Sequence, residues 1–287
     1  MDPLLVVFAL ASAVCYALGL VFTQFGLRSY PPIAGACISV PTSMALFVAL
    51  SPFALDWSGA SVRPALIFAA VGVIFPALNT FLTFYANRLV GPSITGAFSN
   101  MTPVFAAILG GLMLGEVLTG GQIAAIGTVV FGAALIYLGR GLAVPKAVTW
   151  AIMLPLAVAA IRALAQAVVK IGLAEWPSAY AATTIGYMVS AAIILSVGTA
   201  RGALPRGGVL RDRLWFALVG VLNGLSVLFV YAALTRGPVS VVSALVACFP
   251  LVVLAANFLI RGDRTLTPAM LIGIALTVGG VVALVLN

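Results

Sequence analysis

Long apolar stretches follow one another along the whole chain, and each is bounded by charged residues, glycine or proline. A helix that crosses the apolar core of a bilayer needs about 20 residues of this kind. The longest connections between the stretches, 52–64, 140–148 and 201–212, are too short to fold by themselves. The pattern predicts ten transmembrane helices, at residues 4–27, 31–51, 65–87, 92–115, 120–139, 149–173, 179–200, 213–235, 238–260 and 268–286.

The composition supports an integral membrane protein. The chain has 287 residues, of which 63% are hydrophobic and 7% are charged, whereas soluble domains are about one quarter charged. The apolar stretches are too long and too uniform for a transmembrane barrel, whose strands have about 10 residues of alternating polarity. The first stretch follows Met1-Asp2-Pro3 without a basic segment and continues to about Leu27, so we expect it to remain as the first span. The predicted fold class is an all-α membrane bundle.

The net charge of +8 is spread over many short connections. Nucleic-acid binding would require a basic patch interleaved with exposed aromatic residues, so we expect no nucleic-acid partner. The basic residues are concentrated after the odd-numbered spans, which by the positive-inside rule places those connections in the cytoplasm and both termini outside. These residues are Arg28, Arg88, Arg140, Lys146, Arg201, Arg206, Arg211, Arg213, Arg261 and Arg264.

The two halves of the chain repeat each other. Segment 84–92 reads FYANRLVGP and segment 229–238 reads FVYAALTRGP. Glycines recur at a spacing of 146 residues in the pairs Gly26 and Gly172, Gly91 and Gly237, and Gly127 and Gly273. We divide the chain into a first repeat at 1–139, a connecting loop at 140–148 and a second repeat at 149–287. Because each repeat has five spans, the second enters the membrane inverted, which is typical of alternating-access transporters with a site near the midplane.

The order of motifs in both halves resembles a known family. Pro103 leads through an apolar stretch to Gly115-Glu116, followed by Gln122-Ile123, Gly127 and Gly132; Pro250 leads to Arg261-Gly262-Asp263, followed by Gly273 and Gly279-Gly280. This pattern is similar to two copies of the EamA-type repeat of the drug/metabolite transporter superfamily, and it covers essentially the whole chain.

The resemblance implies a ten-helix exporter of amino acids or related metabolites in the bacterial inner membrane, most similar to the aromatic amino-acid exporters. It also implies both termini in the cytoplasm, which is opposite to the charge distribution. One departure is Asp263, which Arg261 and Arg264 flank where the family usually has a Gly-Glu pair. No motif fixes the substrate.

Polar residues inside three spans are the candidates for a substrate site, because each costs free energy in hydrocarbon unless it faces protein or water. The polar positions follow helical spacing in the third and sixth spans and precede Pro103 in the fourth. We expect a small-molecule substrate, with an amino acid favoured, and a monomer in the bilayer. The predicted substrate-binding residues are Asn79, Phe81, Thr83, Tyr85, Ser99, Asn100, Met101, Arg162 and Gln166.

Arg162 lies near the centre of its predicted span, and no acidic residue occurs at comparable depth in any span. We therefore predict that it faces an aqueous cavity and binds a carboxylate through its planar fork of donors. An alternative is that Arg162 donates to backbone carbonyls freed by kinks at Pro103 or Pro155. Asn79, Ser99 and Asn100 also have an alternative role, as hydrogen-bonding contacts between helices.

Pro76, Pro103 and Pro250 lie deep in predicted spans. A proline inside a helix removes one backbone hydrogen bond and bends the helix, so these positions are candidate hinges; static kinks are the alternative.

An enzyme is disfavoured by the side chains present. The chain has no histidine, its six acidic residues all fall near span ends, and Cys15, Cys37 and Cys248 are scattered through apolar segments. This leaves no catalytic residues, metal site, disulfide framework or cofactor to propose. The alternatives to an amino-acid exporter are a transporter of another solute class, such as a nucleotide sugar or a drug, a lipid flippase and, less favoured, an intramembrane enzyme.

Overall fold

A computed structural model of the chain describes residues 2–139, 150–205, 210–261 and 267–286. These residues contain helices and no strand, and ten helical segments among them are long and apolar enough to cross a membrane. The predicted fold class is confirmed. The helices are α1 (Pro3–Gly26), α2 (Pro32–Ala54), α3 (Val62–Ile74), α4 (Ala77–Ser99), α5 (Thr102–Leu114), α6 (Gly120–Leu138), α7 (Met153–Glu175), α8 (Ala179–Ala200), α9 (Leu210–Leu234), α10 (Val239–Val246), α11 (Phe249–Arg261) and α12 (Pro268–Leu286).

The observed spans differ from the predicted ones mainly at their ends. The third span begins at Val62 because Pro64 lies in the first turn of α3, where a proline costs no hydrogen bond. The eighth span begins at Leu210, so that Asp212 lies in the first turn of α9. The connecting loop at 140–148 and the turn with Asp263 and Arg264 lie outside the described residues.

Three spans are each built from two helices. The third span breaks between α3 and α4, where Phe75 is extended (φ −141°, ψ 126°). The fourth breaks between α4 and α5, and the ninth between α10 and α11. Helix α4 bends sharply at Gly91 (φ +78°), so it forms the second half of the third span and the first half of the fourth. A left-handed conformation of this kind favours glycine.

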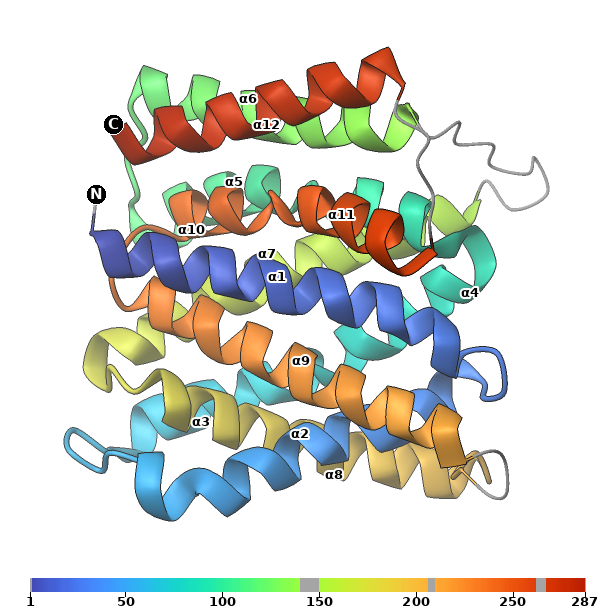
Figure 1. Ribbon diagram of the computed structural model, residues 1–287. Coiled ribbons are helices and arrows are strands. Elements are labelled where there is room, and N and C mark those ends of the chain that lie inside the picture. The colour runs from blue at the N-terminus through green and yellow to red at the C-terminus, as the bar shows by residue number, and fades with distance from the viewer. Residues whose placement is uncertain (1, 140–149, 206–209, 262–266, 287) are drawn as a thin grey trace.

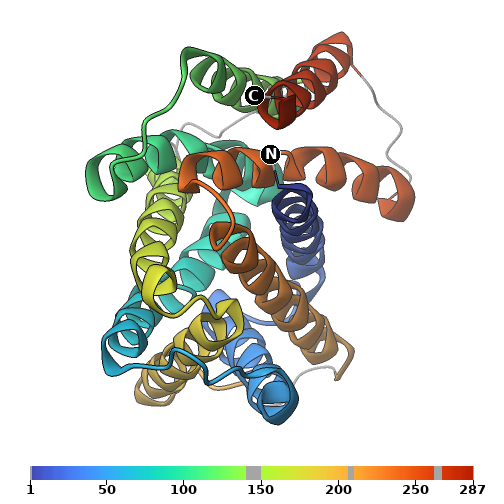
Figure 2. The same ribbon diagram turned by 90° about the vertical axis from the view of Figure 1, so that its left-hand side faces the viewer.

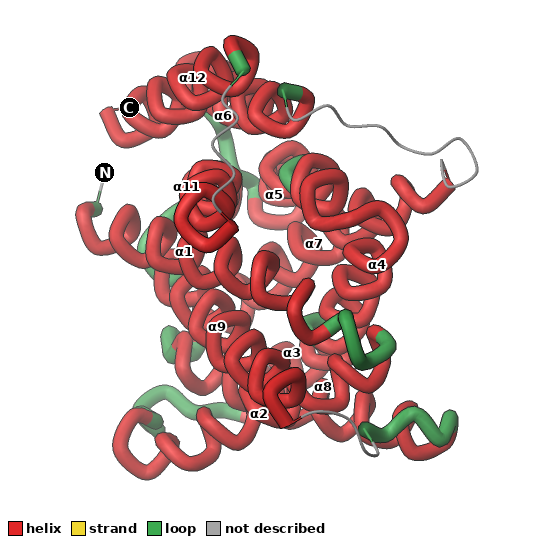
Figure 3. The backbone as a smooth tube through the Cα atoms, turned by 45° about the vertical axis from the view of Figure 1, so that its right-hand side comes forward, coloured by secondary structure: helices red, strands yellow, loops and turns green. Residues whose placement is uncertain are grey.

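The helices lie roughly alongside one another, and both termini are at the same end of the molecule (Figure 1). We call this end the termini end. We call the opposite end the basic end, because the connections that follow the odd-numbered spans, where most basic residues occur, lie there. Helix α6 leads away from the termini end and α12 returns to it. The tube in Figure 3 is helical over almost its whole length, with short connections at both ends.

Helices of one repeat pack against helices of the other, and each such contact has a counterpart in which the two repeats change roles. Helix α1 lies against α9, and α7, the counterpart of α1, lies against α3 and α4. Helices α2 and α8 lie against each other, as do α6 and α12. An exchange of this kind requires a pseudo-twofold axis between the halves, so the inverted five-helix repeats are present as predicted.

Helices α6 and α12 form a pair that stands apart from the other helices (Figure 2). Their backbones approach closely at two glycines. A Cβ atom at Gly273 would lie 2.6 Å from the carbonyl oxygen of Gly132 and 2.8 Å from the amide nitrogen of Ile136. Small residues allow this approach between membrane helices, where association depends on close packing.

We predict that Gly273→Ala destabilises the protein by about 1–3 kcal/mol, because the added methyl group meets backbone atoms that cannot move aside cheaply. Gly279→Ala is the matched control in the same helix, since a Cβ atom there meets nothing within 4 Å. Thermal unfolding of both variants in detergent measures the difference. Equal unfolding temperatures for the two variants would contradict the prediction.

Candidate functional site

Two cavities lie between the repeats and share Arg162 as a lining residue. The empty space between the lining atoms, part of it open to solvent, is about 460 Å³ in the larger and about 230 Å³ in the smaller. The larger cavity is lined by Tyr16, Gly19, Leu20, Thr23, Phe75, Pro76, Asn79, Thr80, Thr83, Phe84, Arg162, Tyr187, Asn223, Ser226 and Val227. The smaller cavity is lined by Ser99, Asn100, Thr102, Arg162, Gln166, Ser243, Val246, Ala247 and Phe249.

Arg162 lies near the middle of α7 and is only 6% exposed. Its guanidinium carbon lies 3.9 Å from the centre of the Tyr16 ring, in a cation–π contact. No hydrogen bond or ion pair joins Arg162 to a described residue, and its Nε atom is buried without a partner. The alternative of bonds to carbonyls freed near Pro103 or Pro155 is therefore not observed within the described chain.

Tyr16 and Arg162 are counterparts in the two repeats. Their numbers differ by 146, the same spacing that separates the repeated glycines. Because α1 and α7 are counterpart helices, a contact between equivalent positions places this pair on the pseudo-twofold axis. The centre of the fold thus holds one aromatic ring and one cation at symmetry-related positions.

Several polar atoms around the cavities are buried without a hydrogen-bond partner. A buried polar group in this condition costs about 1–3 kcal/mol, so a cluster of them is a candidate surface for a polar ligand. These atoms are Tyr16 Oη, Asn79 Oδ1, Ser99 Oγ, both side-chain atoms of Asn100, and Arg162 Nε.

The structure brings together six of the nine predicted substrate-binding residues. Asn79 and Thr83 line the larger cavity, whereas Ser99, Asn100 and Gln166 line the smaller one. Arg162 lines both. Residues from the third, fourth and sixth spans therefore face one region, as the sequence analysis expected.

Phe81, Tyr85 and Met101 line neither cavity, so their role in substrate binding stays a prediction. Phe81 and Tyr85 stack on each other with ring centroids 6.0 Å apart, and Tyr85 is 36% exposed. They follow Asn79 and Thr83 by two residues, about 200° around the helix, so they lie on the opposite face of α4. Met101 lies at the break before α5.

Other lining residues were not selected from the sequence. Asn223 and Ser226 of α9 line the larger cavity, and Ser243 of α10 lines the smaller one. They carry the same signal as Asn79, a polar side chain inside an apolar span. Tyr16 had a stronger signal, because its number differs by the repeat spacing from that of Arg162.

The three prolines lie at or next to the helix breaks. Pro76 precedes α4 and lines the larger cavity. Pro103 lies in the first turn of α5, and Pro250 is the second residue of α11. A proline at these positions loses no helical hydrogen bond, so each begins a half-helix rather than bending a continuous one. Movement about the breaks remains a prediction.

Comparisons with known proteins agree with this architecture. The profile of the EamA-like transporter family matches residues 3–138 and again residues 149–286. A solved structure titled only "Crystal structure of protein" is 17% identical and covers 98% of this chain and 96% of that chain, with a TM-score of 0.76. At this identity the likeness shows the fold alone. No curated protein matched the chain.

We predict that Arg162→Met changes the free energy of unfolding by no more than about 1.5 kcal/mol. The variant loses a buried cation–π contact worth about 2 kcal/mol, but it also removes a charge that costs about 2.5–3.5 kcal/mol at mid-membrane. Ser12→Ala serves as a reference, because Ser12 donates to the Ser226 carbonyl at 2.8 Å and its loss should cost about 1 kcal/mol. A loss of about 3–5 kcal/mol in Arg162→Met during chemical or thermal unfolding would instead reveal a structural partner.

Proposed function

This chain belongs to the EamA-like transporter family, whose profile matches both of its halves, and it is a membrane transporter of small solutes. Given this, we propose that it exports amino acids, aromatic or otherwise apolar, by alternating access. The proposal depends on one observation above all, the buried guanidinium of Arg162 without an acidic partner among the described residues.

A substrate carboxylate would supply the negative charge that balances the Arg162 guanidinium. The guanidinium presents donors in a planar fork that matches a carboxylate, and a pair of this kind is stronger away from bulk water. Arg162 borders both cavities, so a carboxylate bound there leaves one side for the amino group and the other for the side chain.

The smaller cavity suits an ammonium group. Ser99 Oγ and Asn100 Oδ1 are buried acceptors without partners on its wall, and Gln166 lies on the α7 side. The larger cavity suits an apolar side chain, because Phe75, Phe84 and Tyr187 form part of its wall and its volume is about twice that of the smaller one. Buried aromatic rings contribute large apolar contact areas to such a site.

We propose a location in the bacterial inner membrane as a monomer. The connections that follow odd-numbered spans lie at the basic end (Figure 1), and the cations in or next to them include, among the described residues, Arg28, Arg88, Arg201, Arg211 and Arg213. This distribution favours the basic end in the cytoplasm. Arg140, Lys146, Arg206 and Arg264 lie outside the described residues.

We expect Arg162→Lys and Arg162→Gln to weaken amino-acid binding about 10- to 100-fold, because one loses the planar fork and the other loses the charge. Binding to the purified protein is measured by ligand-induced thermal shift, and transport is measured by uptake into proteoliposomes. Arg63→Gln is the control, since Arg63 is exposed and pairs with Glu175 at the surface.

The choice of ligands tests the substrate class. Phenylalanine should stabilise the parent protein, whereas phenethylamine, which lacks the carboxylate, should not. Stabilisation by nucleotide sugars, neutral drugs or lipids but by no amino acid would overturn the proposed substrate and favour one of those classes.

Pro103→Ala and Pro250→Ala should slow transport several-fold while leaving substrate affinity nearly unchanged. Alanine removes the ring that clashes with a preceding helical turn, so the two half-helices can join into one stiffer helix, which opposes the swinging motion that alternating access requires. Pro52→Ala is the control, because Pro52 lies within α2 away from the breaks and is exposed. Unchanged turnover in both hinge variants would return these prolines to static kinks.

A further inference from the structure

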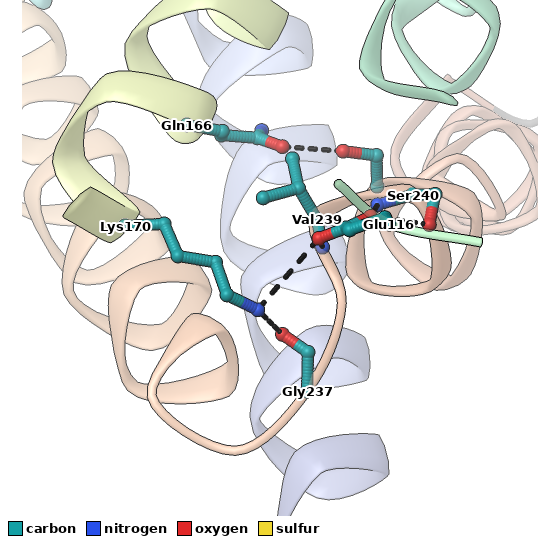
Figure 4. A network of polar contacts seen from close by, with 7 residues as sticks. Glu116, Gln166, Lys170, Gly237, Val239 and Ser240 are labelled. Atoms are coloured by element: carbon teal, nitrogen blue, oxygen red, sulfur yellow. Dashed lines mark hydrogen bonds and ion pairs between the residues drawn. The ribbon is translucent and has the colours of Figure 1, made fainter. Parts of the chain in front are cut away.

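Glu116 and Lys170 line neither cavity, yet both lie at the termini end of the molecule, where their side chains point toward each other (Figure 4). The Glu116 side chain is 10% exposed and that of Lys170 is 26% exposed. Glu116 lies in the connection between α5 and α6, and Lys170 lies near the end of α7. Removing two opposite charges from water is costly, and this pair lies outside the central cavities, so it needs a separate explanation.

Glu116 binds the first turn of α10. One carboxylate oxygen accepts from the backbone N–H of Val239 at 2.6 Å, and the other accepts from the Ser240 hydroxyl at 2.8 Å and the Ser240 N–H at 3.3 Å. A carboxylate is stabilised there by the free N–H groups and the helix dipole. Because Glu116 belongs to the first repeat and α10 to the second, this contact joins the two halves.

Lys170 completes the contact from α7. Its ammonium group lies 3.8 Å from Glu116 Oε1 and donates to the carbonyl of Gly237, just before α10. One turn closer to the cavity, the Ser243 hydroxyl of α10 donates to Gln166 Oε1. Ser243 and Gln166 both line the smaller cavity. Two successive polar contacts thus lie between that cavity and the termini end.

We propose that Glu116, Lys170 and the first turn of α10 form a gate that closes the central cavities toward the termini end. The pair Gln166–Ser243 connects this gate to the cavity beside Arg162, because Arg162, Gln166 and Lys170 lie one turn apart on the same face of α7 and span about 12 Å. Opening requires α10 to leave Glu116 and swing about the break before α11. The inference rests on the alternating-access part of the proposed function but not on the identity of the substrate.

The residues of the proposed gate differ in type from their counterparts in the other repeat. At the spacing of 146 residues, the counterparts of Gln166 and Ser243 are Leu20 and Ala97, which are apolar. The counterpart of Lys170 is Gln24, which is uncharged. Asp263, which matches Glu116, lies outside the described residues. Lys170 therefore brings a charge to the termini end that Gln24, at the corresponding position toward the basic end, does not carry.

The test measures access to the smaller cavity from each side. In a background with Cys15, Cys37 and Cys248 replaced, Val246→Cys places a single thiol on the wall of that cavity. Sealed vesicles are treated with a membrane-impermeant maleimide. A separate Ser58→Cys protein, whose exposed loop joins α2 and α3, identifies the vesicles in which the termini end faces outward. No substrate is needed, so an error in the proposed substrate does not affect the result.

Lys170→Met and Glu116→Gln should each raise the labelling rate of Val246→Cys from the termini end about tenfold, because each removes a charge-assisted contact that favours the closed state. Lys170→Arg keeps the charge and should label like the parent. Gln24→Met, the change at the counterpart position, should not raise labelling from the termini end. Each variant is first required to elute as a single species in size-exclusion chromatography.

Two results would overturn the gate. One is an unchanged labelling rate from the termini end in the folded gate variants. The other is an equal increase in Gln24→Met, which would show general loosening of the bundle. If Lys170→Met does not fold, Glu116→Gln and Lys170→Arg still decide between these outcomes.

Discussion

The guanidinium of Arg162 over the ring of Tyr16 is the contact on which the interior of this protein depends. Water is scarce at this depth, so a cation there must be balanced by an aromatic face, a counter-ion or a ligand. The structure provides the aromatic face at 3.9 Å and no acidic partner among the described residues. The cavities on both sides of Arg162, and the unpartnered polar atoms of Asn79, Ser99 and Asn100, are arranged around that unbalanced charge.

Duplication explains why this contact lies at the centre. Inverted repeats bring equivalent positions of α1 and α7 together at the pseudo-twofold axis, so position 16 meets position 162 whatever residues occupy them. The two copies then differ in chemistry. The row Tyr16, Leu20 and Gln24 on α1 corresponds to Arg162, Gln166 and Lys170 on α7. A nearly symmetric backbone thus carries side chains that distinguish one end of the transport route from the other.

The helix breaks lie where the free backbone N–H and C=O groups can find hydrogen-bond partners. Irregular backbone within a membrane is tolerated where it is enclosed by protein or lines a water-filled cavity. Pro76 and Asn100, at two of the breaks, line the cavities, and Ala247 and Phe249 do so at the third. The third break divides α10 from α11, so the short helix that Glu116 binds does not continue into the rest of its span. The proposed substrate site and the proposed gate therefore share one set of backbone interruptions.

The sequence alone determined the spans, the duplication and the candidate role of Arg162, because apolar length, repeat spacing and charge burial are properties of the linear chain. It also found Asn79, Thr83, Ser99, Asn100 and Gln166, since a polar residue in an apolar span must face protein or water. It could not tell which aromatic residues of α4 line a cavity, and the structure places Phe84 on the wall of the larger cavity but not Phe81 or Tyr85. Tyr16 contacts Arg162, which is 146 residues away in the other repeat. Glu116 contacts Val239 of α10, 123 residues away, and Lys170, also in the other repeat. Only the packing of one repeat against the other decides such contacts, because no local pattern records which helices meet across the axis.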